Sequence, residues 1–166
     1  MWPEPVERVA RELRAAAVAE ATIQEFPEGT PTADAAARAI GCRLDQIVKS
    51  IVFVCDGGYV VAMVPGDRRA DEGCVAEATG AKSIRVARAD EVVAATGFEP
   101  GAVAPFPLPR VDAVLLERML LANDRVWVGA GTSSHMAGLA PGELQRLAGA
   151  RTADLVGPRY SSKTDR

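Results

Sequence analysis

The segment that most constrains the fold is KSIVFVCDGGYVVAMVPGD, residues 49–67. It contains two runs rich in β-branched residues, with Asp56, Gly57 and Gly58 between them. Glycine tolerates the positive φ that a tight turn requires, and β-branched side chains pack well on a pleated surface. The segment therefore predicts a β-hairpin.

Outside the hairpin, segments of helical and of strand periodicity follow one another. From Val6 onward, apolar residues recur at i, i+3, i+4 and i+7 with charged residues between them, which predicts an amphipathic helix. An Ala-rich helix follows Thr30 and Thr32, either of which suits its N-cap, and Gly41 suits its end. Further helices are predicted at 71–79, 90–96 and 141–148, and further strands at 22–26, 83–86, 111–115, 125–128 and 135–139.

These elements predict an α+β fold, because strands and helices are interspersed without the regular βαβ rhythm of a doubly wound sheet. The 166 residues fit one domain with its own core. We therefore expect a single domain with a mixed, largely closed, barrel-like β-sheet flanked by helices. Within it we expect an N-terminal helix at residues 1–21, the main domain at 22–155 and a polar tail at 156–166.

Composition and charge narrow the classes of function. A net charge of −3 provides no overall basic field for nucleic acid, so any polyanion must bind a local patch. No apolar run approaches the ~20 residues that span a bilayer, and the N-terminus lacks the basic and apolar regions of a secretory signal. We expect a cytoplasmic location. Three cysteines without a CxxC pair argue against a disulfide framework.

Several apparent motifs are rejected. The glycines of GAGTSS, residues 129–134, precede a segment that is not helical, so a bound phosphate would meet no helix N-terminus. Ser133 and Ser134 beside His135 do not make a catalytic triad, which needs spatial geometry and a third orienting group. With one histidine and no cluster at metal-ligand spacing, we expect neither a metal nor a cofactor. Cys42 remains a weak candidate nucleophile, whose only histidine partner would be His135.

Lys49 stands at the entrance to an apolar run and has two interpretations. Strand phase places it on the side of Ile51 and Phe53. The opposite side of the strand is nearly as apolar, so phase does not decide whether the lysine points inward. Lys49 is either a side chain that reaches solvent at a strand end or a residue that meets a substrate.

Four arginines near the hairpin also have two interpretations. Arg68 and Arg69 follow the turn at residues 65–67, and Arg85 and Arg88 flank the next strand. Such arginines are commonly solvated. If they share one face, they form a phosphate-binding patch.

Five segments carry a resemblance to a known family. They are Thr30-Pro31-Thr32 with the Ala-rich helix, QIVKS at 46–50, VAMVPGDRRAD at 61–71, GAKSIRVARADEV at 80–92 and GFEPGAVAPFPLP at 97–109. Residues 101–105 of the last segment match a GxxxP loop. From about Thr22 to Leu155 the chain resembles the YbaK and prolyl-tRNA-synthetase-associated editing domain family, whose members hydrolyse mischarged aminoacyl-tRNA.

The resemblance implies deacylation of the ester between an amino acid and the 3′-terminal adenosine of tRNA. Lys49 would hold the terminal phosphate or the acylated ribose, and backbone N–H groups between Gly101 and Pro105 would stabilise the negative charge on the carbonyl oxygen. Water would attack, with assistance from the ribose 2′-hydroxyl. The resemblance implies substrate-binding roles for Thr30, Ser50, Ala102, Val103, Ala104, Gly131 and His135, and tRNA-binding roles for Arg68 and Arg69.

The resemblance also implies a substrate class and partners. A small amino acid is expected, because a pocket that rejects the cognate residue by size admits smaller ones. The tRNA is tRNA-Pro, the commonest partner in the family, or another tRNA, and an aminoacyl-tRNA synthetase is a further partner. We expect a free-standing monomer or weak dimer. The late loop departs from the family, since 132–134 replace more basic residues and Met136 replaces an acid found in some relatives.

Two alternatives remain open at this point. The first is a non-catalytic module that binds a tRNA end or a protein on the same fold. The second is an esterase for small free esters, whose activity would not depend on tRNA or on salt.

Overall fold

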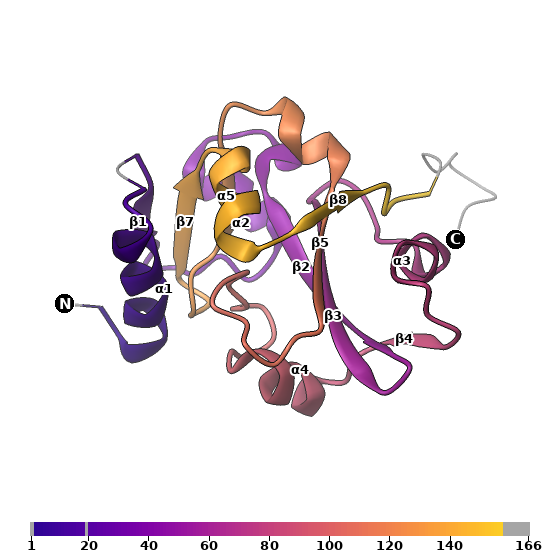
Figure 1. The fold of residues 1–166 in the computed structure, drawn as a ribbon. Helices are drawn as coiled ribbons and strands as arrows, with labels where there is room; N and C mark the ends of the chain where they lie inside the picture. The colour runs from indigo at the N-terminus through magenta and orange to yellow at the C-terminus, as the bar shows by residue number, and fades with distance from the viewer. Residues whose placement is uncertain (1, 19, 158–166) are drawn as a thin grey trace.

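Two β-sheets form the centre of the computed structural model, which describes residues 2–18 and 20–157 (Figure 1). The helices are α1 (Glu4–Ala15), α2 (Ala33–Ile40), α3 (Glu72–Thr79), α4 (Ala89–Thr96) and α5 (Pro141–Ala148), with 3₁₀ turns η1 (Leu44–Gln46) and η2 (Arg118–Ala122). The strands are β1 (Thr22–Glu25), β2 (Val48–Cys55), β3 (Gly58–Pro65), β4 (Ile84–Val86), β5 (Ala113–Glu117), β6 (Val126–Gly129), β7 (His135–Leu139) and β8 (Arg151–Ala153). The predicted mixture of helices and strands in one α+β domain is confirmed.

The larger sheet has the strand order β4-β2-β3-β5-β8, and the smaller has the order β1-β7-β6. In the larger sheet β5 runs parallel to both β3 and β8, while β2 is antiparallel to β3 and β4. The smaller sheet is antiparallel throughout. Within the described ranges, one β-bridge, between Ile47 and Trp127, joins the two sheets.

The prediction of a largely closed, barrel-like sheet is wrong. A barrel requires each strand to pair on both sides. Among the described strands, β4 and β8 end one sheet and β1 ends the other, and none of these edges pairs with another. β4 pairs only with residues 53–55 of β2. The larger sheet therefore ends at β4 and does not continue into a closed barrel.

The predicted hairpin is confirmed, with β2 and β3 paired along their full lengths. Cys55 lies opposite Gly58, so the turn consists of Asp56 and Gly57. Both have positive φ, 52° and 85°, as a two-residue turn of type I′ requires. α2 is capped by Thr32 rather than Thr30, because the Thr32 hydroxyl accepts a hydrogen bond from the Ala35 N–H at 3.0 Å.

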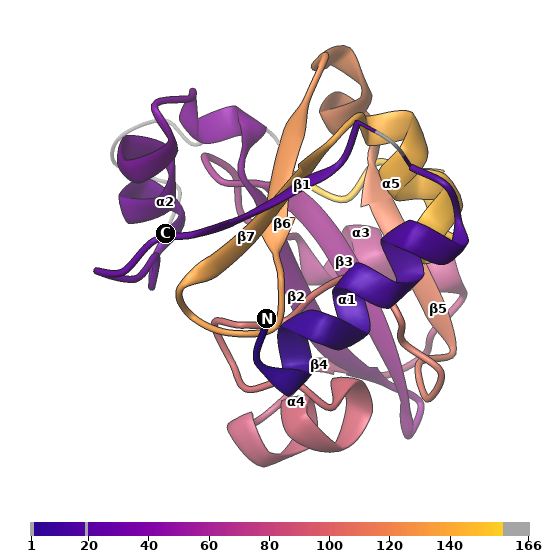
Figure 2. The ribbon, with the colours of Figure 1, turned by 90° about the vertical axis from the view of Figure 1, so that its left-hand side faces the viewer.

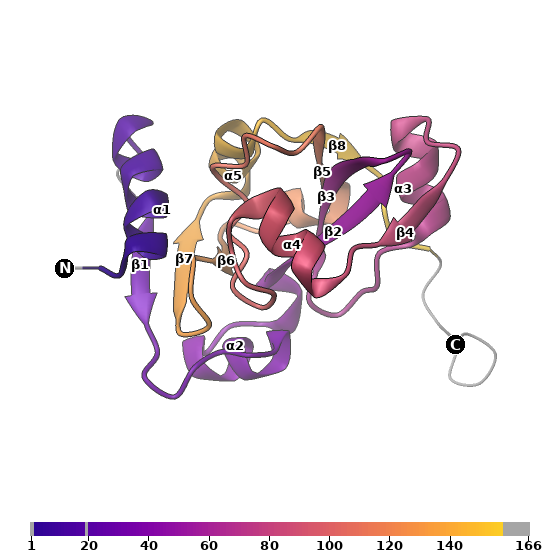
Figure 3. The same cartoon turned by 90° about the horizontal axis from the view of Figure 1, so that it is seen from below.

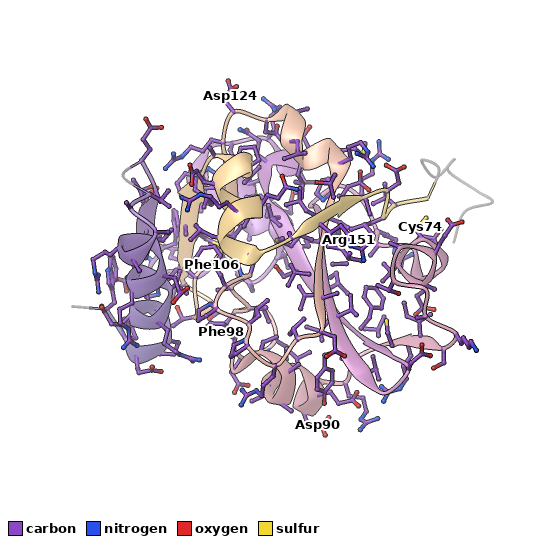
Figure 4. All side chains as sticks on the ribbon, in the orientation of Figure 1. Cys74, Asp90, Phe98, Phe106, Asp124 and Arg151 are labelled. Atoms are coloured by element: carbon purple, nitrogen blue, oxygen red, sulfur yellow. The ribbon has the colours of Figure 1, made fainter. Side chains whose placement is uncertain are left out.

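The main core lies between the two sheets and includes the long loop at 97–109. This apolar cluster takes residues from α1, both sheets, α5 and the loop: Val9, Leu13, Met63, Leu116, Val128, Leu139, Leu144, Phe98, Val103, Ala104 and Phe106. Figure 4 labels Phe98 and Phe106 within the outline of the fold, whereas Cys74, Asp90 and Asp124 lie at its periphery. A second cluster packs the hairpin against α3 through Phe53, Val60 and Val75.

α1 and α3 lie at opposite ends of the molecule, with the sheets between them (Figure 1 and Figure 3). Viewed from the α1 end, α1 and α2 lie on different sides of β1 and β7 (Figure 2). α1 also holds the start of the long loop, since Arg8 Nη2 donates to the carbonyl of Gly97 at 3.1 Å. The guanidinium carbon of Arg8 lies 4.6 Å from the centre of the Phe98 ring.

Three short elements were absent from the sequence analysis: η1, η2 and β8. β8 has only three residues, and pairs in parallel with β5, so a distant strand rather than a local pattern defines it. The predicted strand at 111–115 is found at 113–117. Most of the predicted polar tail at 156–166 lies outside the described residues, and Val156 forms a bridge with Ala70.

Glu117, at the end of β5, is a buried carboxylate that connects three segments. It is only 2% exposed. Its oxygens accept from the backbone N–H of Met119 at 3.0 Å and from those of Leu155 and Val156 at 2.7 and 3.2 Å. The carboxylate therefore ties η2 and the end of the domain to the central sheet.

Replacement Glu117→Ala is expected to lower the free energy of unfolding by about 3 kcal/mol, because one buried and two partly buried backbone donors lose a charged acceptor. Urea denaturation measures the change. The matched control is Glu143→Ala on α5, which removes a half-exposed carboxylate paired with Arg146 and is expected to change stability by less than about 0.5 kcal/mol. Equal effects of the two substitutions would contradict the structural role of Glu117.

Candidate functional site

A cavity of about 290 Å³ lies where the two sheets meet. Four segments line it: residues 30–33 with Ala36 at the start of α2, residues 47–51 at the start of β2, Gly101 and Val103 of the long loop, and Gly129 with Met136 of the smaller sheet. Its walls combine apolar side chains with the hydroxyl-bearing residues Thr30, Thr32 and Ser50 and one cation, Lys49.

The cavity exists because β2 is only partly paired on one side. β4 covers residues 53–55 of β2, and among the described residues the smaller sheet forms a β-bridge to this segment only at Ile47. Residues 48–51 therefore pair with β3 on one side and face the cavity on the other.

Lys49 is half-buried at this cavity. Its ammonium donates a hydrogen bond to the backbone carbonyl of Arg68, in the turn after β3, at 2.5 Å. Burial lowers the pKa of the Lys49 ammonium; Asp67 raises it and Arg69 lowers it further. The lysine is thus held at the cavity by the turn it contacts, with its charge partly desolvated, and does not extend freely into solvent.

The loop that carries Gly101 is fixed from both sides. Phe98 and Phe106 are buried, and the N–H of Gly131 donates to the carbonyl of Ala102 at 3.1 Å. Gly101 itself is exposed and has φ +84°, which favours glycine. Gly129 permits the close approach of the loop to β6, since a Cβ there would lie 2.6 Å from the carbonyl oxygen of Val103.

The structure brings together five of the predicted site residues. Lys49, Thr30, Ser50, Gly101 and Val103 all line the cavity. Ala102, Ala104 and Pro105 are buried in the loop and are not among the lining residues. Gly131 lies against α1, since a Cβ there would lie 2.7 Å from the backbone of Pro5.

His135 lies away from the Lys49 cavity. It is 4% exposed, its Nδ1 lies 2.5 Å from the Thr132 hydroxyl, and its ring packs edge-on against Trp2 at 5.5 Å between centroids. Side chains alternate along β7, so Met136 faces the cavity while His135 faces the side of α1.

Two of the four arginines near the hairpin are already paired. Arg85 makes a bidentate ion pair with Glu91 at 2.7 and 2.8 Å, which lowers the pKa of Glu91 to about 2. Arg88 also contacts Glu91, at 3.5 Å. Arg69 is exposed and Arg68 half-buried, next to the turn that holds Lys49. The phosphate-binding interpretation is therefore restricted to Arg68 and Arg69.

Cysteine chemistry finds little support at this site. Burial raises the pKa of the Cys42 thiol, which disfavours the thiolate that a nucleophile needs. In the described part of the chain, no three His, Cys, Asp or Glu side chains are grouped as metal ligands. No helix within the described ranges combines the length and apolarity needed to cross a bilayer.

Several lining residues were missed in the sequence analysis. Pro31, Thr32 and Ala33 adjoin the predicted Thr30, and Ile47, Val48 and Ile51 adjoin Lys49. Their closeness in sequence to predicted residues was an available signal. Gly129 and Met136 also lie close to predicted residues, Gly131 and His135, but which of these neighbours lines the cavity depends on how the smaller sheet meets β2.

Comparison with known sequences identifies related proteins. The sequence profile of the aminoacyl-tRNA editing domain matches residues 27–147. A proline–tRNA ligase of Xanthomonas oryzae pv. oryzae (strain MAFF 311018) is 32% identical over 125 residues, which are 75% of this chain and 22% of the ligase. YwhH of Bacillus subtilis (strain 168), an uncharacterized protein, is 32% identical over 77% of this chain and 82% of its own length. The chain spans about a fifth of the length of that ligase.

Solved structures of high similarity cover nearly the whole chain. One is described as a candidate trans-editing enzyme for prolyl tRNA synthetase, with a TM-score of 0.87 and 34% identity over 95% of this chain and 100% of its own. Another, the hypothetical protein APE2540, has a TM-score of 0.84 and 30% identity over 90% of this chain and 99% of its own.

Replacement Gly129→Ala is expected to displace the loop at Val103 and to lower the free energy of unfolding by about 1–3 kcal/mol, because the added methyl group meets a backbone carbonyl. Chemical denaturation measures the stability, and amide chemical shifts of Gly101 and Val103 report the displacement. In the control Gly142→Ala, on α5, a Cβ has no neighbour within 4 Å and no loss of stability is expected. Unchanged shifts at Val103 in Gly129→Ala would contradict this account of the loop.

Proposed function

Since the chain belongs to the aminoacyl-tRNA editing domain family, we propose that it is a deacylase, which hydrolyses the ester bond of a mischarged aminoacyl-tRNA. The observation that carries this proposal is the placement of Lys49 and the loop with Gly101 on the same cavity. Lys49 provides a fixed positive charge, and the loop with Gly101 provides a rigid backbone.

Lys49 would hold the terminal phosphate or the acylated ribose of the tRNA end. Its bond to the Arg68 carbonyl uses one of the three ammonium donors, which leaves two for a ligand. A cation held at a defined point orients the ester, and orientation of reacting groups accounts for a large part of enzymatic rate. In this role Lys49 stays protonated and takes no proton from water.

The loop at 101–105 would stabilise the negative charge that develops on the ester carbonyl oxygen. Within the described residues, the backbone N–H groups of Gly101 and Val103 take part in no hydrogen bond, and both residues line the cavity. Free donors held on a rigid loop stabilise an oxyanion without reorganisation at the moment of reaction.

The attacking group would be water, assisted by the ribose 2′-hydroxyl of the substrate. Among the described residues that line the cavity, none is a histidine or a carboxylate that could serve as a general base. Catalysis of this kind would rest on positioning and on electrostatic stabilisation of the transition state.

A small amino acid suits the site, because the cavity volume of about 290 Å³ must also admit part of the terminal ribose. The relatives that are proline–tRNA ligases favour tRNA-Pro as the carrier. We propose action in trans, in the cytoplasm, on a tRNA charged by a separate synthetase; the similarity to a candidate trans-editing enzyme over 95% of the chain supports this.

Replacement Lys49→Ala is expected to leave the protein folded and to lower deacylation by about 100-fold or more, because the ester loses its positioning cation. Amino acid release from Ala-, Cys- and Ser-tRNA-Pro, with enzyme well below substrate, measures turnover. The control Lys82→Ala removes an exposed lysine that is not among the residues lining this cavity and is expected to retain full activity. Unfolding of Lys49→Ala, or unchanged turnover, would contradict the assigned role.

The same measurement distinguishes the alternative of a binding module. A module that only binds the tRNA end protects an aminoacyl ester stoichiometrically, whereas an enzyme releases many equivalents. An esterase for free esters would show no dependence on tRNA or on salt.

Arg69 is expected to contact a phosphate of the acceptor end. Replacement Arg69→Ala should weaken tRNA binding and reduce the slope of log affinity against log salt by about 0.7–1, as loss of one phosphate contact does. Fluorescence anisotropy with labelled tRNA at several salt concentrations measures this slope. Arg118→Ala, at an arginine paired with Asp154 at 3.1 Å, is the control with an unchanged slope. A slope that is equal in Arg69→Ala and wild type would exclude the contact.

A further inference from the structure

The first half of β2 presents main-chain polar groups to the cavity. On the β4 side of this strand, the bond from the Ala87 N–H to the Val52 carbonyl, at 2.9 Å, lies beyond the paired residues 53–55. In an antiparallel ladder the main-chain groups of a strand point alternately to one neighbour and to the other. The N–H and C=O of Ser50, two residues before Val52, therefore point to the same side as those of Val52, away from β3.

Neither β4 nor a described loop supplies a partner for these groups of Ser50. Within residues 2–18 and 20–157, no hydrogen bond from the loops or from β4 reaches the N–H or C=O of Ser50. Its Oγ is likewise buried without a hydrogen-bond partner in the described structure. Buried polar groups nearly always have a partner. A buried hydroxyl without a partner at a cavity wall, on a residue whose main-chain groups point away from β3, therefore indicates a place where a polar ligand binds.

The ammonium group of Lys49 does not bind these polar groups of Ser50. Successive side chains of a strand project to opposite faces, so Lys49 and Ser50 diverge. The Lys49 ammonium is bonded to the carbonyl of Arg68, in the turn after β3. Ser50 instead lies on the strand face of Val48, which packs in the same cluster as Val103 of the loop.

We propose that Ser50 holds the α-ammonium group of the aminoacyl ester, with its main-chain carbonyl as the first acceptor and its hydroxyl as the second. The proposal rests on the deacylase function proposed above. An ammonium group has three N–H donors, and hydrogen bonds from a charged donor are the stronger ones. A phosphate offers only acceptors and does not match a carbonyl. Rotation about χ1 between staggered positions brings the serine hydroxyl toward the same donor.

This contact gives Ser50 a positioning role in the reaction. One carbon atom joins the ammonium to the ester carbonyl in an aminoacyl group. Holding the ammonium at β2 therefore also fixes the carbonyl relative to Gly101 and Val103 of the loop. The site would select esters of α-amino acids over esters of other small acids.

Two stable analogues test the proposal, adenosines that carry an alanyl or a propionyl group in amide linkage at the 3′ position. They differ in the α-ammonium group alone. Calorimetry with the wild-type protein is expected to show about 10–100-fold tighter binding of the alanyl analogue, the range for hydrogen bonds to charged groups. Replacement Ser50→Ala should reduce this ratio by about threefold or more, and Ser50→Thr should restore it, because threonine keeps the hydroxyl.

Ser133→Ala is the matched control, since Ser133 is exposed and does not line the cavity. In Ser133→Ala, the ratio of the affinities for the alanyl and propionyl analogues should equal that of the wild-type protein. Equal affinities of the two analogues for wild type would overturn the ammonium site, and an unchanged ratio in Ser50→Ala would overturn the role of the hydroxyl. Turnover of mischarged tRNA is measured in parallel. Turnover together with equal affinities rejects this inference alone, whereas absence of turnover on every aminoacyl-tRNA rejects the proposed function and the inference together.

Discussion

Burial of the loop at 97–109 between the two sheets is the constraint on which the rest of the site depends. Phe98, Val103 and Phe106 belong to the same apolar cluster as residues of both sheets, of α1 and of α5. The loop cannot leave its place without opening that core. Its exposed tip at Gly101 is therefore presented from a rigid scaffold, which is how proteins commonly position functional groups on irregular backbone.

The local parts of the fold could be predicted from the sequence, and the pairing of the strands could not. The hairpin, the end of α2 at Gly41 and the bounds of β7 follow from turn residues and periodicity that lie within a few residues of each other. Whether a sheet closes into a barrel depends instead on whether its two edge strands form hydrogen bonds with each other. β8 shows the difference, because a polar segment of three residues becomes a strand only through its parallel partner β5.

In the candidate site, too, some residues could be predicted from the sequence and others depend on how the strands pair. Lys49 and the GxxxP loop carry sequence signals that a family resemblance can use. The side to which Lys49 points depends on the turn at Arg68, and strand phase alone left it open. Met136 lines the cavity and His135 does not, a difference of one residue in the phase of β7. β4 pairs with β2 only at residues 53–55 and does not extend to Ser50. The point at which a distant strand ends cannot be predicted from the local sequence pattern.

The contacts of α1 couple the N-terminal helix to the chemistry of the loop. Arg8 binds the carbonyl of Gly97 where the loop begins, and Pro5 packs against Gly131, whose N–H binds the carbonyl of Ala102 inside the loop. Local opening of α1 would therefore remove the bond at Gly97 and the packing behind Gly131, although the loop would keep its own buried side chains in the core. Hydrogen exchange in α1 would then report how often these supports of the loop are lost, from a helix that itself lines no part of the cavity.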